Sequence, residues 1–235
     1  MAAVLRFPVR VKGAESHGDK VTIYTFECTD RKPRFKCGQF IHLALDEVEI
    51  GKHWPESKPF TIATSHKNKN CIRLIVATAG KFTTRMTEQL TADAEVWLKG
   101  PYGQFIVKSD EQLDTVLVAG GTGISPFLAF IEQALFDDKL AGQVTLHYVA
   151  RSEDLFIGKD LINQCAQRFE NFTVHFYSTG GDKDKRVKSA NLVSETDSRP
   201  ANFYLCGPRS MVHQLSEELV ADHGVDAERI FQEEW

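Results

Sequence analysis

The hydrophobic pattern of this chain changes near its middle, and this change limits the possible folds more than any single motif does. Up to residue 108, short apolar runs alternate with polar residues and are separated by Gly and Pro. Beyond residue 114, short apolar runs instead alternate with stretches of helical spacing. The first pattern is typical of antiparallel strands, and the second is typical of βαβ units around a parallel sheet. We therefore predict two domains, 1–108 and 109–235, with the join in the polar stretch 109–114.

Each half has its own predicted architecture. The first half suits an antiparallel barrel with a helix over one end. Its strands are predicted at 21–26, 39–45, 60–63, 72–77 and 95–99, and its helix at 83–90. The second half suits a parallel sheet whose ligands bind at the carboxyl ends of the strands. Its strands are predicted at 115–119, 143–149, 172–177, 202–206 and 229–231, and its helices at 124–135, 159–169 and 210–223.

Composition excludes several classes of protein. With 42% hydrophobic and 26% charged residues, the chain resembles an average globular protein and not a disordered one. No apolar run reaches the ~18 residues of a spanning helix, and the N-terminus lacks the features of a signal peptide. We therefore expect a cytoplasmic protein without a membrane span. The five cysteines form no Cys-x-x-Cys pair or Cys/His cluster, so we expect free thiols, no structural metal and no iron–sulfur cluster.

Charge is distributed unevenly between the halves. Residues 1–108 carry 17 Lys and Arg against 11 Asp and Glu, a net charge of +6, and the remainder carries −10. This asymmetry indicates an anionic partner for the first half, although ordinary surface variation would also produce it. The basic residues form no dense tract, which argues against nucleic acid as that partner.

The strongest local motif joins a buried strand to a helix through glycines. It runs from Val116 through Gly120-Gly121-Thr122-Gly123 to Ser125 and Pro126. Glycines allow a tight turn and close approach of a phosphate, and the helix N-terminus offers unpaired amides. The motif is neither Gly-x-Gly-x-x-Gly nor a Walker A loop. Dinucleotide binding and a purely structural turn both remain open on this motif alone.

Three further motifs are ambiguous when each is taken alone. The segment 206–211 (Cys-Gly-Pro-Arg-Ser-Met) follows a predicted strand, and taken alone it is better explained by a buried cysteine before a Gly-Pro turn. The segment 58–63 (Lys-Pro-Phe-Thr-Ile-Ala) can hold an anion and a flat ring, or be a plain barrel strand. The segment 80–84 (Gly-Lys-Phe-Thr-Thr) can seat an anion at a helix start, or only cap the helix.

In this order, the motifs resemble those of the ferredoxin–NADP reductase superfamily, and the resemblance covers nearly the whole chain. Segment 58–61 is similar to the family's Arg-x-Tyr-Ser/Thr, 120–126 to its Gly-Gly-Thr-Gly-Ile-x-Pro, and 206–211 to its Cys-Gly-Pro-x-x-Met. Glu233-Glu234-Trp235 resembles its C-terminal Glu-x-aromatic. The resemblance implies a six-stranded antiparallel β-barrel that binds flavin, followed by an α/β parallel-sheet NAD(P)-binding domain.

The resemblance also implies roles for individual residues on the flavin side. Phe60 would flank the isoalloxazine, the Thr61 hydroxyl would bond near flavin N5, and Lys58 would meet the flavin phosphate. Residues 80–84 would give amides and hydroxyls to the pyrophosphate. The other flavin-binding positions implied are Pro59, Ile62, Ala63, Gly80, Lys81, Phe82, Thr83 and Thr84.

On the nucleotide side, the glycine-rich turn would cradle the nicotinamide dinucleotide. Cys206 would lie by the nicotinamide C4, and Trp235 would stack on the flavin until nicotinamide enters. The catalytic positions implied are Thr61, Cys206, Glu233 and Trp235. The nucleotide-binding positions implied are Gly120, Gly121, Thr122, Gly123, Ser125, Pro126, Cys206, Gly207, Pro208 and Met211.

Two departures from the family pattern affect flavin binding. Lys58 replaces an Arg and offers a point charge without the bidentate fork, and Phe60 replaces a Tyr and lacks the phenol. Flavin is therefore expected to be held less tightly. FAD is favoured over FMN because it is the family's commoner flavin.

NADP(H) is favoured over NAD(H) because of cations that can meet a 2′-phosphate. Arg151 and Ser152 follow the second strand of the predicted nucleotide domain, and Arg186 lies in a Gly- and Lys-rich segment. Acidic residues nearby leave open that these cations are only solvated surface groups.

The resulting hypothesis is an NAD(P)H-dependent flavoprotein reductase that passes hydride to FAD and then single electrons to an acidic carrier, a ferredoxin or flavodoxin. A monomer or weak dimer is expected. One alternative is a direct reductase of free flavins or ferric chelates. Another is a non-autonomous electron-transfer subunit of a larger complex. A nucleotide-binding module without flavin is the third.

Overall fold

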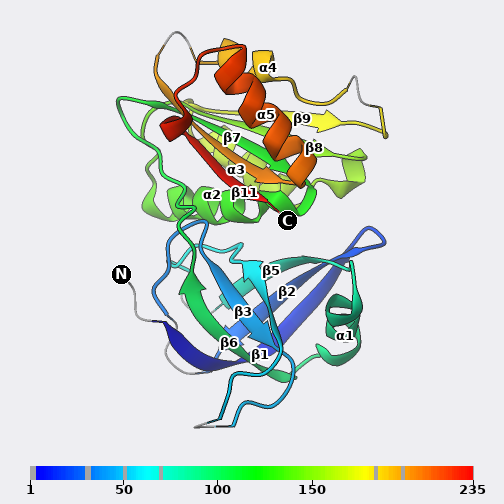
Figure 1. Cartoon of the computed structure of the whole chain (residues 1–235). Coiled ribbons are helices and arrows are strands. Elements are labelled where there is room, and N and C mark those ends of the chain that lie inside the picture. Colours follow the sequence, from blue (N-terminus) through cyan, green and yellow to red (C-terminus); the bar gives the residue numbers. More distant parts are fainter. Residues whose placement is uncertain are drawn as a thin grey trace. The chain divides into compact units, whose positions relative to one another are not determined.

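The computed structural model describes residues 4–29, 33–49, 52–68, 71–182, 185–196 and 199–234. The chain divides into two compact units, Met1–Ile106 and Val107–Trp235 (Figure 1). The division lies between Ile106 and Val107, shortly before the polar stretch 109–114. Each unit is described by itself below.

The first unit is a six-stranded antiparallel barrel. Its strands follow the order β4-β3-β6-β1-β2-β5. The open edges meet where Ile62 bridges Leu74 and the Ala63 amide donates to the Arg73 carbonyl at 2.8 Å. The predicted barrel architecture is thus confirmed. The strands are β1 (Leu5–His17), β2 (Val21–Cys28), β3 (Phe40–Ala44), β4 (Ser57–Thr61), β5 (Cys71–Ala77) and β6 (Glu95–Tyr102).

The longest strand of the barrel, β1, was not among the runs predicted from the sequence. Its residues alternate as expected for a half-buried strand, with Phe7, Val9 and Val11 in the core. Pro8 interrupts this run, and a proline weakens the sequence signal of a strand. The barrel therefore has one more strand than the apolar runs alone indicated.

Helix α1 (Lys81–Gln89) begins two residues earlier than predicted and closes one end of the barrel core. Phe82 and Met86 are buried on one helical face, and Leu90 follows at the same spacing. This i, i+4, i+8 pattern packs the helix onto the core cluster of the strands.

The second unit is a parallel five-stranded sheet in the order β11-β10-β7-β8-β9. Helices α2 and α3 pack together, as do α4 and α5, and the two pairs cover opposite faces (Figure 1). This confirms the predicted α/β class. Its strands are β7 (Asp114–Gly120), β8 (Val144–Ala150), β9 (Phe172–Ser178), β10 (Ala201–Gly207) and β11 (Ile230–Glu234). Its helices are α2 (Ser125–Asp137), α3 (Lys159–Arg168), α4 (Ser189–Ser194) and α5 (Arg209–Ala221).

The strand order sets the position of the functional turns. The chain runs outward from β7 through β8 to β9, and then returns to β10 on the other side of β7. The carboxyl ends of β7 and β10 are therefore the topological switch point, where open α/β sheets bind ligands.

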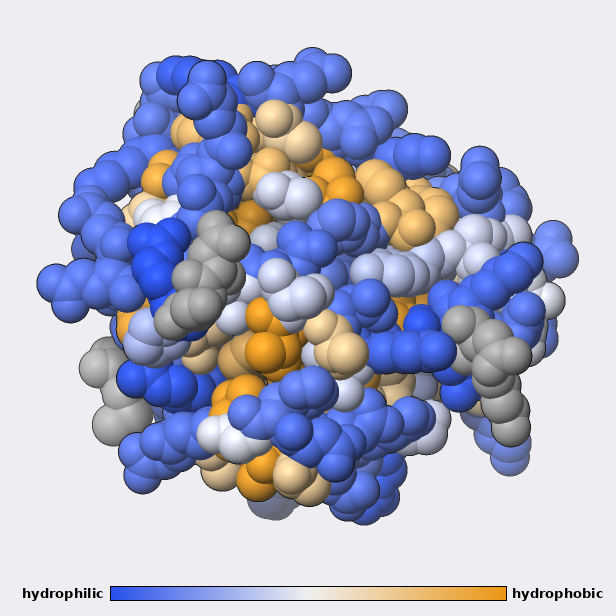
Figure 2. Space-filling model, turned by 90° about the horizontal axis from the view of Figure 1, so that it is seen from above, coloured by the Kyte–Doolittle hydropathy of each residue, from blue (hydrophilic) through white to orange (hydrophobic). Residues whose placement is uncertain are grey.

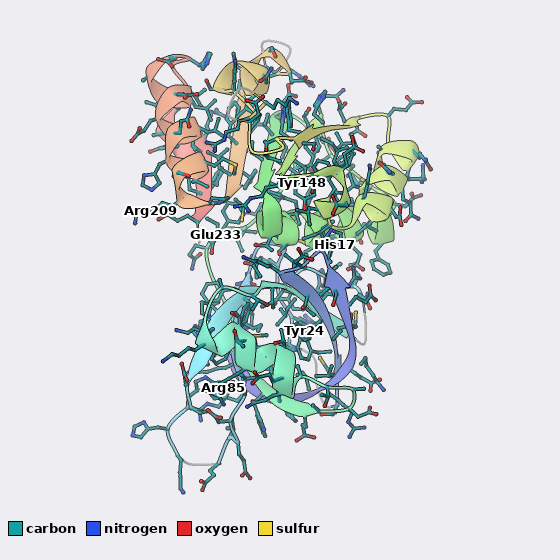
Figure 3. All side chains as sticks on the ribbon, turned by 90° about the vertical axis from the view of Figure 1, so that its right-hand side faces the viewer. His17, Tyr24, Arg85, Tyr148, Arg209 and Glu233 are labelled. Atoms are coloured by element: carbon teal, nitrogen blue, oxygen red, sulfur yellow. The ribbon has the colours of Figure 1, made fainter. Side chains whose placement is uncertain are left out.

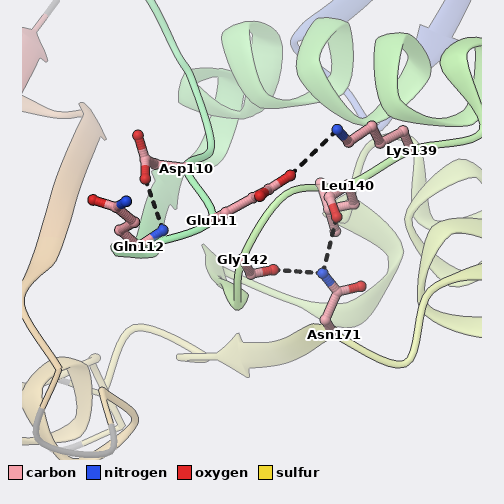
Figure 4. A network of polar contacts seen from close by, with 7 residues as sticks. All are labelled: Asp110, Glu111, Gln112, Lys139, Leu140, Gly142 and Asn171. Atoms are coloured by element: carbon pink, nitrogen blue, oxygen red, sulfur yellow. Dashed lines mark hydrogen bonds and ion pairs between the residues drawn. The ribbon is translucent and has the colours of Figure 1, made fainter.

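The opposite end of the sheet is held by a polar network (Figure 4). The Asn171 amide donates to the carbonyls of Leu140, at 3.1 Å, and Gly142. Gly142 has φ +61, and a Cβ there would lie 2.0 Å from the Asp110 carbonyl oxygen. These contacts tie the segments before β7, β8 and β9 together at the amino ends of the strands.

The surface is largely hydrophilic on the face that Figure 2 shows. Among the described residues, the exposed large hydrophobic side chains are those of Val4, Phe136 and Val220. No helix in the described part of the chain combines the length and apolar character needed to cross a bilayer. Cys165 and Cys206 are buried, free thiols.

Candidate functional site

Strand β4 carries the first predicted motif at the side of the barrel. Lys58 and Pro59 are exposed, whereas Phe60 and Thr61 are half-buried. Thr61 lies opposite Phe40, outside the core, and Phe60 lies opposite the buried Ile41 and packs against the core. Thr61 therefore lies with its hydroxyl on the outer face of the barrel. The Phe60 ring is partly covered by the core, so only its exposed part can contact a ligand.

Ile62 and Ala63, also predicted to bind the cofactor, belong to the barrel wall. Each side chain is 1% exposed. Their amides donate to the carbonyls of Gln39 at 3.0 Å and Arg73 at 2.8 Å. Their side chains and amide donors serve barrel closure, and neither is available to a ligand.

An aromatic surface lies beside Thr61 on the same outer face. Phe40 stacks on Tyr102 with ring centroids 5.7 Å apart, and His42 meets Tyr102 edge-on at 5.5 Å. Burial, and then the charge of Lys99, lowers the pKa of His42. Neither Phe40 nor Tyr102 was predicted as a site residue, because their proximity to Thr61 depends on strand pairing.

A cationic extension borders this surface. Trp54 donates its indole N–H to the Ser57 hydroxyl at 2.9 Å, and Ser57 contacts His42 Nδ1 at 3.3 Å. The guanidinium of Arg6 and the ammonium of Lys99 lie 5.5 and 5.7 Å from the Trp54 ring centroid. Two cations are thus held over one indole.

The start of α1 forms the second predicted motif. The Thr83 hydroxyl accepts from the amides of Ala79 at 2.9 Å and Gly80 at 3.1 Å, and donates to the Gly80 carbonyl at 3.0 Å. Thr83 therefore orders the turn and does not point its hydroxyl at a ligand. The N-cap residue, Gly80, has no side chain to bond the first-turn amides, and a Cβ there would meet nothing within 4 Å. The first-turn amides can consequently face an anion.

The remaining predicted residues of α1 differ in exposure. Phe82 is 7% exposed and anchors the helix in the core, so its contribution to a ligand is limited to its amide. Lys81 and Thr84 are exposed at the helix start. Their side chains lie at the solvent surface.

In the second unit, β7 leads into a 3₁₀ turn, Gly121–Ile124, and then into α2. Gly121 has φ +53, in the left-handed region that favours glycine, and a Cβ there would meet nothing within 4 Å. The Ser125 hydroxyl donates to the Thr122 carbonyl at 2.8 Å, so it stabilises the turn. Pro126 is buried in the first turn of α2, where its missing N–H has no consequence.

This turn packs directly on the one that follows β10. A Cβ on Gly123 would lie 2.2 Å from the Cys206 carbonyl oxygen. A Cβ on Gly120 would lie 2.8 Å from the Pro208 ring. Gly207, with φ +156, would place a Cβ 2.7 Å from the Met211 methyl. The structure thus brings the two predicted motifs together. The Met211 side chain packs beside Gly120 and Gly207, one glycine from each turn.

Cys206 and Glu233 lie opposite each other on the paired strands β10 and β11. Cys206 is 2% exposed, and burial, followed by the charge of Glu233, raises the pKa of its thiol. Burial also raises the pKa of Glu233. The thiol therefore remains protonated, which makes it a poor nucleophile.

The next residue of β11 is fixed by two basic side chains from α5. Glu234 Oε2 lies 2.8 Å from His213 Nε2, and its other oxygen lies 3.6 Å from Arg209 Nε. Figure 3 labels Arg209 and Glu233 at this end of the second unit. Trp235, predicted as catalytic and cofactor-binding, lies outside the described residues.

A cationic cavity lies at the carboxyl end of β9. Its volume is about 470 Å³. Its lining residues are Phe176, Tyr177, Ser178, Lys185, Arg186, Lys188 and Asn191. Arg186 was predicted from the sequence, and the two lysines were not. Arg151 and Ser152 do not line this cavity, although the Arg151 carbonyl accepts from the Gly180 amide at 2.7 Å.

Comparison with known proteins matches both units to families. Residues 8–106 match the FAD-binding domain family, and residues 117–217 match the oxidoreductase NAD-binding domain family. The chain is 27% identical over 214 residues to the reductase component of propane 2-monooxygenase from Rhodococcus jostii (strain RHA1), covering 86% of this chain and 55% of that protein. It is 30% identical over 180 residues to a probable dihydroorotate dehydrogenase B (NAD(+)) electron transfer subunit from Thermococcus kodakarensis, covering 76% and 66%.

Solved structures share the fold. The cytochrome P450 reductase of Amycolatopsis superposes with a TM-score of 0.80 at 20% identity, covering 100% of this chain and 71% of that chain. The ferredoxin-NADP+ reductase from Plasmodium falciparum superposes with a TM-score of 0.77 at 16% identity, covering 98% and 96%. The chain spans little more than half the length of the first curated relatives it matches. From its two matched domains and its fold, the chain belongs to the ferredoxin–NADP reductase superfamily of FAD- and nicotinamide-nucleotide-binding oxidoreductases.

Proposed function

We propose that this chain is the reductase module of an electron-transfer system, which uses a reduced nicotinamide dinucleotide to deliver electrons to a separate acceptor. The observation that carries the proposal is the contact between the two turns at the switch point of the parallel sheet. Glycine is required at Gly120, Gly123 and Gly207 by close contacts, while Gly121 faces open space. Such a turn accepts a dinucleotide phosphate at a helix N-terminus.

FAD fits the first unit. The uncapped amides at the start of α1 and the open space over Gly80 suit a pyrophosphate. The outer face of the barrel suits a flat ring, with Thr61 donating to it and Phe40 and Tyr102 beside it. Lys58 would supply a point charge to a phosphate. When bound, FAD supplies the redox chemistry, accepting a hydride and releasing electrons one at a time.

The protein groups near the nicotinamide are proposed to position it without acid–base chemistry. Burial keeps the Cys206 thiol protonated, and Glu233 beside it has a raised pKa. Hydride transfer needs close, water-free approach of two rings, and neither group has to take a proton. Cys206 and Glu233 are therefore proposed as positioning groups.

NADPH is the proposed donor because of the cavity after β9. Lys185, Arg186 and Lys188 line it, and its described lining residues include no acid. A 2′-phosphate needs such positive charge, whereas NAD-binding sites usually place a carboxylate on the ribose. The aromatic rings of Phe176 and Tyr177 would border the adenosine.

The proposed acceptor is an acidic one-electron carrier such as a ferredoxin or flavodoxin. The net charge of +6 on residues 1–108 favours an anionic partner, and Arg6 and Lys99 over Trp54 form a fixed cationic patch beside the proposed flavin face. A second candidate is a subunit of a larger redox complex. It is favoured by the 30% identity to a protein named as an electron transfer subunit.

Anaerobic spectroscopy tests the proposal. The purified chain, loaded with FAD, is titrated with NADPH and then with NADH. Bleaching of the flavin absorbance, faster with NADPH, supports the function and the donor. A chain that binds no FAD, or whose flavin neither donor bleaches, contradicts it. Rapid bleaching without turnover of any soluble carrier favours the subunit of a complex.

A further inference from the structure

Tyr148 forms a bridge beneath the glycine-rich turn that no sequence motif indicated. It lies toward the carboxyl end of β8, next to the central strand β7, and is completely buried (Figure 3). Its hydroxyl donates to the Gly121 carbonyl at 3.1 Å and accepts from the Ile157 amide at 3.1 Å. One phenol thus satisfies two backbone groups from segments 36 residues apart in the sequence.

The first of these bonds sets the orientation of a peptide group in the turn. In a trans peptide, the carbonyl and the following N–H point in opposite directions. The Gly121 carbonyl is held toward the sheet by Tyr148, so the Thr122 N–H points away from the sheet. Space is open beside this turn, because a Cβ on Gly121 would meet nothing within 4 Å. The amide also stands at a helix start, where N–H groups have no partner within the helix.

The second bond and the ring packing keep the hydroxyl in place. Ile157 is 2% exposed, and Phe156 packs edge-on against the Tyr148 ring with centroids 5.1 Å apart. Burial raises the pKa of Tyr148 well above its usual value, so the phenol keeps its proton and remains a donor. Removing the oxygen would leave the Gly121 carbonyl and the Ile157 amide without this partner in a buried site.

We propose that Tyr148 is a positioning residue for nucleotide binding, whose hydroxyl fixes the Gly121–Thr122 peptide so that the Thr122 amide faces the dinucleotide phosphates. This inference rests on the proposed function, because it takes the glycine-rich turn as the phosphate site. Tyr148 contacts no ligand itself. Its effect is transmitted through one backbone carbonyl.

The test compares Tyr148→Phe with a matched control, Tyr204→Phe. Tyr204 is a buried tyrosine of the same sheet, stacked on Phe231 at 4.7 Å, and its hydroxyl meets the Lys108 backbone and not the turn. Binding of NADP+ and NAD+ to the oxidised, FAD-loaded full chain is measured by calorimetry, with thermal unfolding and the flavin spectrum alongside.

We expect Tyr148→Phe to weaken the tighter-binding dinucleotide about 10-fold, the loss corresponding to one hydrogen bond of ordinary strength to a charged group. The flavin spectrum stays unchanged, and in turnover KM rises while kcat is retained. Tyr204→Phe leaves the dissociation constant within 2-fold of wild type, about 0.4 kcal/mol. Equal affinities for Tyr148→Phe and wild type overturn the inference, as does an equal loss in both variants. Wild-type protein that binds neither dinucleotide overturns the proposed function, and the inference with it.

Discussion

Replacing Gly123 with alanine should separate the two turns that form the proposed nucleotide site. A Cβ at this position would lie 2.2 Å from the Cys206 carbonyl oxygen, 2.6 Å from its carbon and 2.9 Å from the Gly207 Cα. All three are backbone atoms, so no side-chain rotation relieves the clash. Ordinary contact begins at 3.4 Å. The turns after β7 and β10 must therefore separate by more than 1 Å.

Overpacking of this kind costs about 1–3 kcal/mol. For a unit of this size, that corresponds to a fall in Tm of about 4–12 °C. Dinucleotide affinity should fall by about 10-fold or more, because the displaced turns carry the amides proposed to face the phosphates. FAD binding should be retained, since the start of α1 and the outer face of β4 belong to the other unit.

The assay combines circular dichroism melting with calorimetric titration of NADP+ and with FAD absorbance. Gly13→Ala is the control for a glycine substitution as such, because a Cβ there meets nothing within 4 Å and φ is ordinary. Gly121→Ala separates clash from backbone strain. It has open space but a left-handed φ, so it should cost only about 1–2 kcal/mol. If Gly123→Ala melts with wild type and binds NADP+ within 2-fold of it, the close contact does not exist and the reasoning fails.

Other predictions concern charge and protonation. Arg186→Ala should weaken the binding of NADP+ about 10-fold and leave the binding of NAD+ unchanged in calorimetry, because the 2′-phosphate is the only difference between the two dinucleotides. Equal losses of affinity for both would refute the assignment of Arg186 to the 2′-phosphate. Burial, and then the charge of His175, lowers the pKa of His147 to about 4 from 6.5. The unfolded chain therefore takes up a proton below pH 6.5 that the folded chain refuses, so stability should fall as pH drops from 6.5 to 4, by up to about 3 kcal/mol. Urea unfolding of His147→Phe should show a flatter dependence, and an unchanged slope would contradict this. The raised pKa of Cys206 predicts that iodoacetamide leaves this thiol unmodified at pH 8 in the native protein, which mass spectrometry can measure. Rapid labelling would contradict this, because it would show that the thiol is accessible and ionised.

Much of the fold was predictable because the two hydrophobic periods differ. Strands such as β7, with seven consecutive buried residues, and helices such as α2, with a continuous apolar face, carry their signal within a short window. The predicted bounds of these elements differ from the observed ones by one or two residues. Strand β1 and helix α4 were missed for different local reasons. β1 contains Pro8, and α4 has only six residues, too few for a helical period to emerge.

The candidate site was predictable only where its signal is local. The glycines in the sequence indicated the two turns. Few other residues can adopt a left-handed φ or allow a close approach of another backbone segment. The same positions did not reveal that Gly123 faces Cys206, since 83 residues separate them. Thr83 and Ser125 show the converse limit. Their hydroxyls suggested ligand donors in the sequence, yet each bonds to a carbonyl three residues earlier in its own turn. A hydroxyl at a helix start stabilises that start before it serves a ligand.

Tyr148 shows which functional residues sequence patterns conceal. Within β8 it looks like one more large side chain in a strand that is buried on both faces, and burial alone would explain its presence. The role of its oxygen becomes visible only when β8 is placed next to β7 in the sheet. The Gly121 carbonyl that the oxygen bonds lies in the turn that follows β7. A phenol in such a place would otherwise bury a polar group at a cost. The cost is offset here because the same oxygen bonds two backbone groups, the Gly121 carbonyl and the Ile157 amide. The Tyr148 hydroxyl and the Gly121 carbonyl are therefore joined by this bond, and a substitution that moves either group should alter the position of the other.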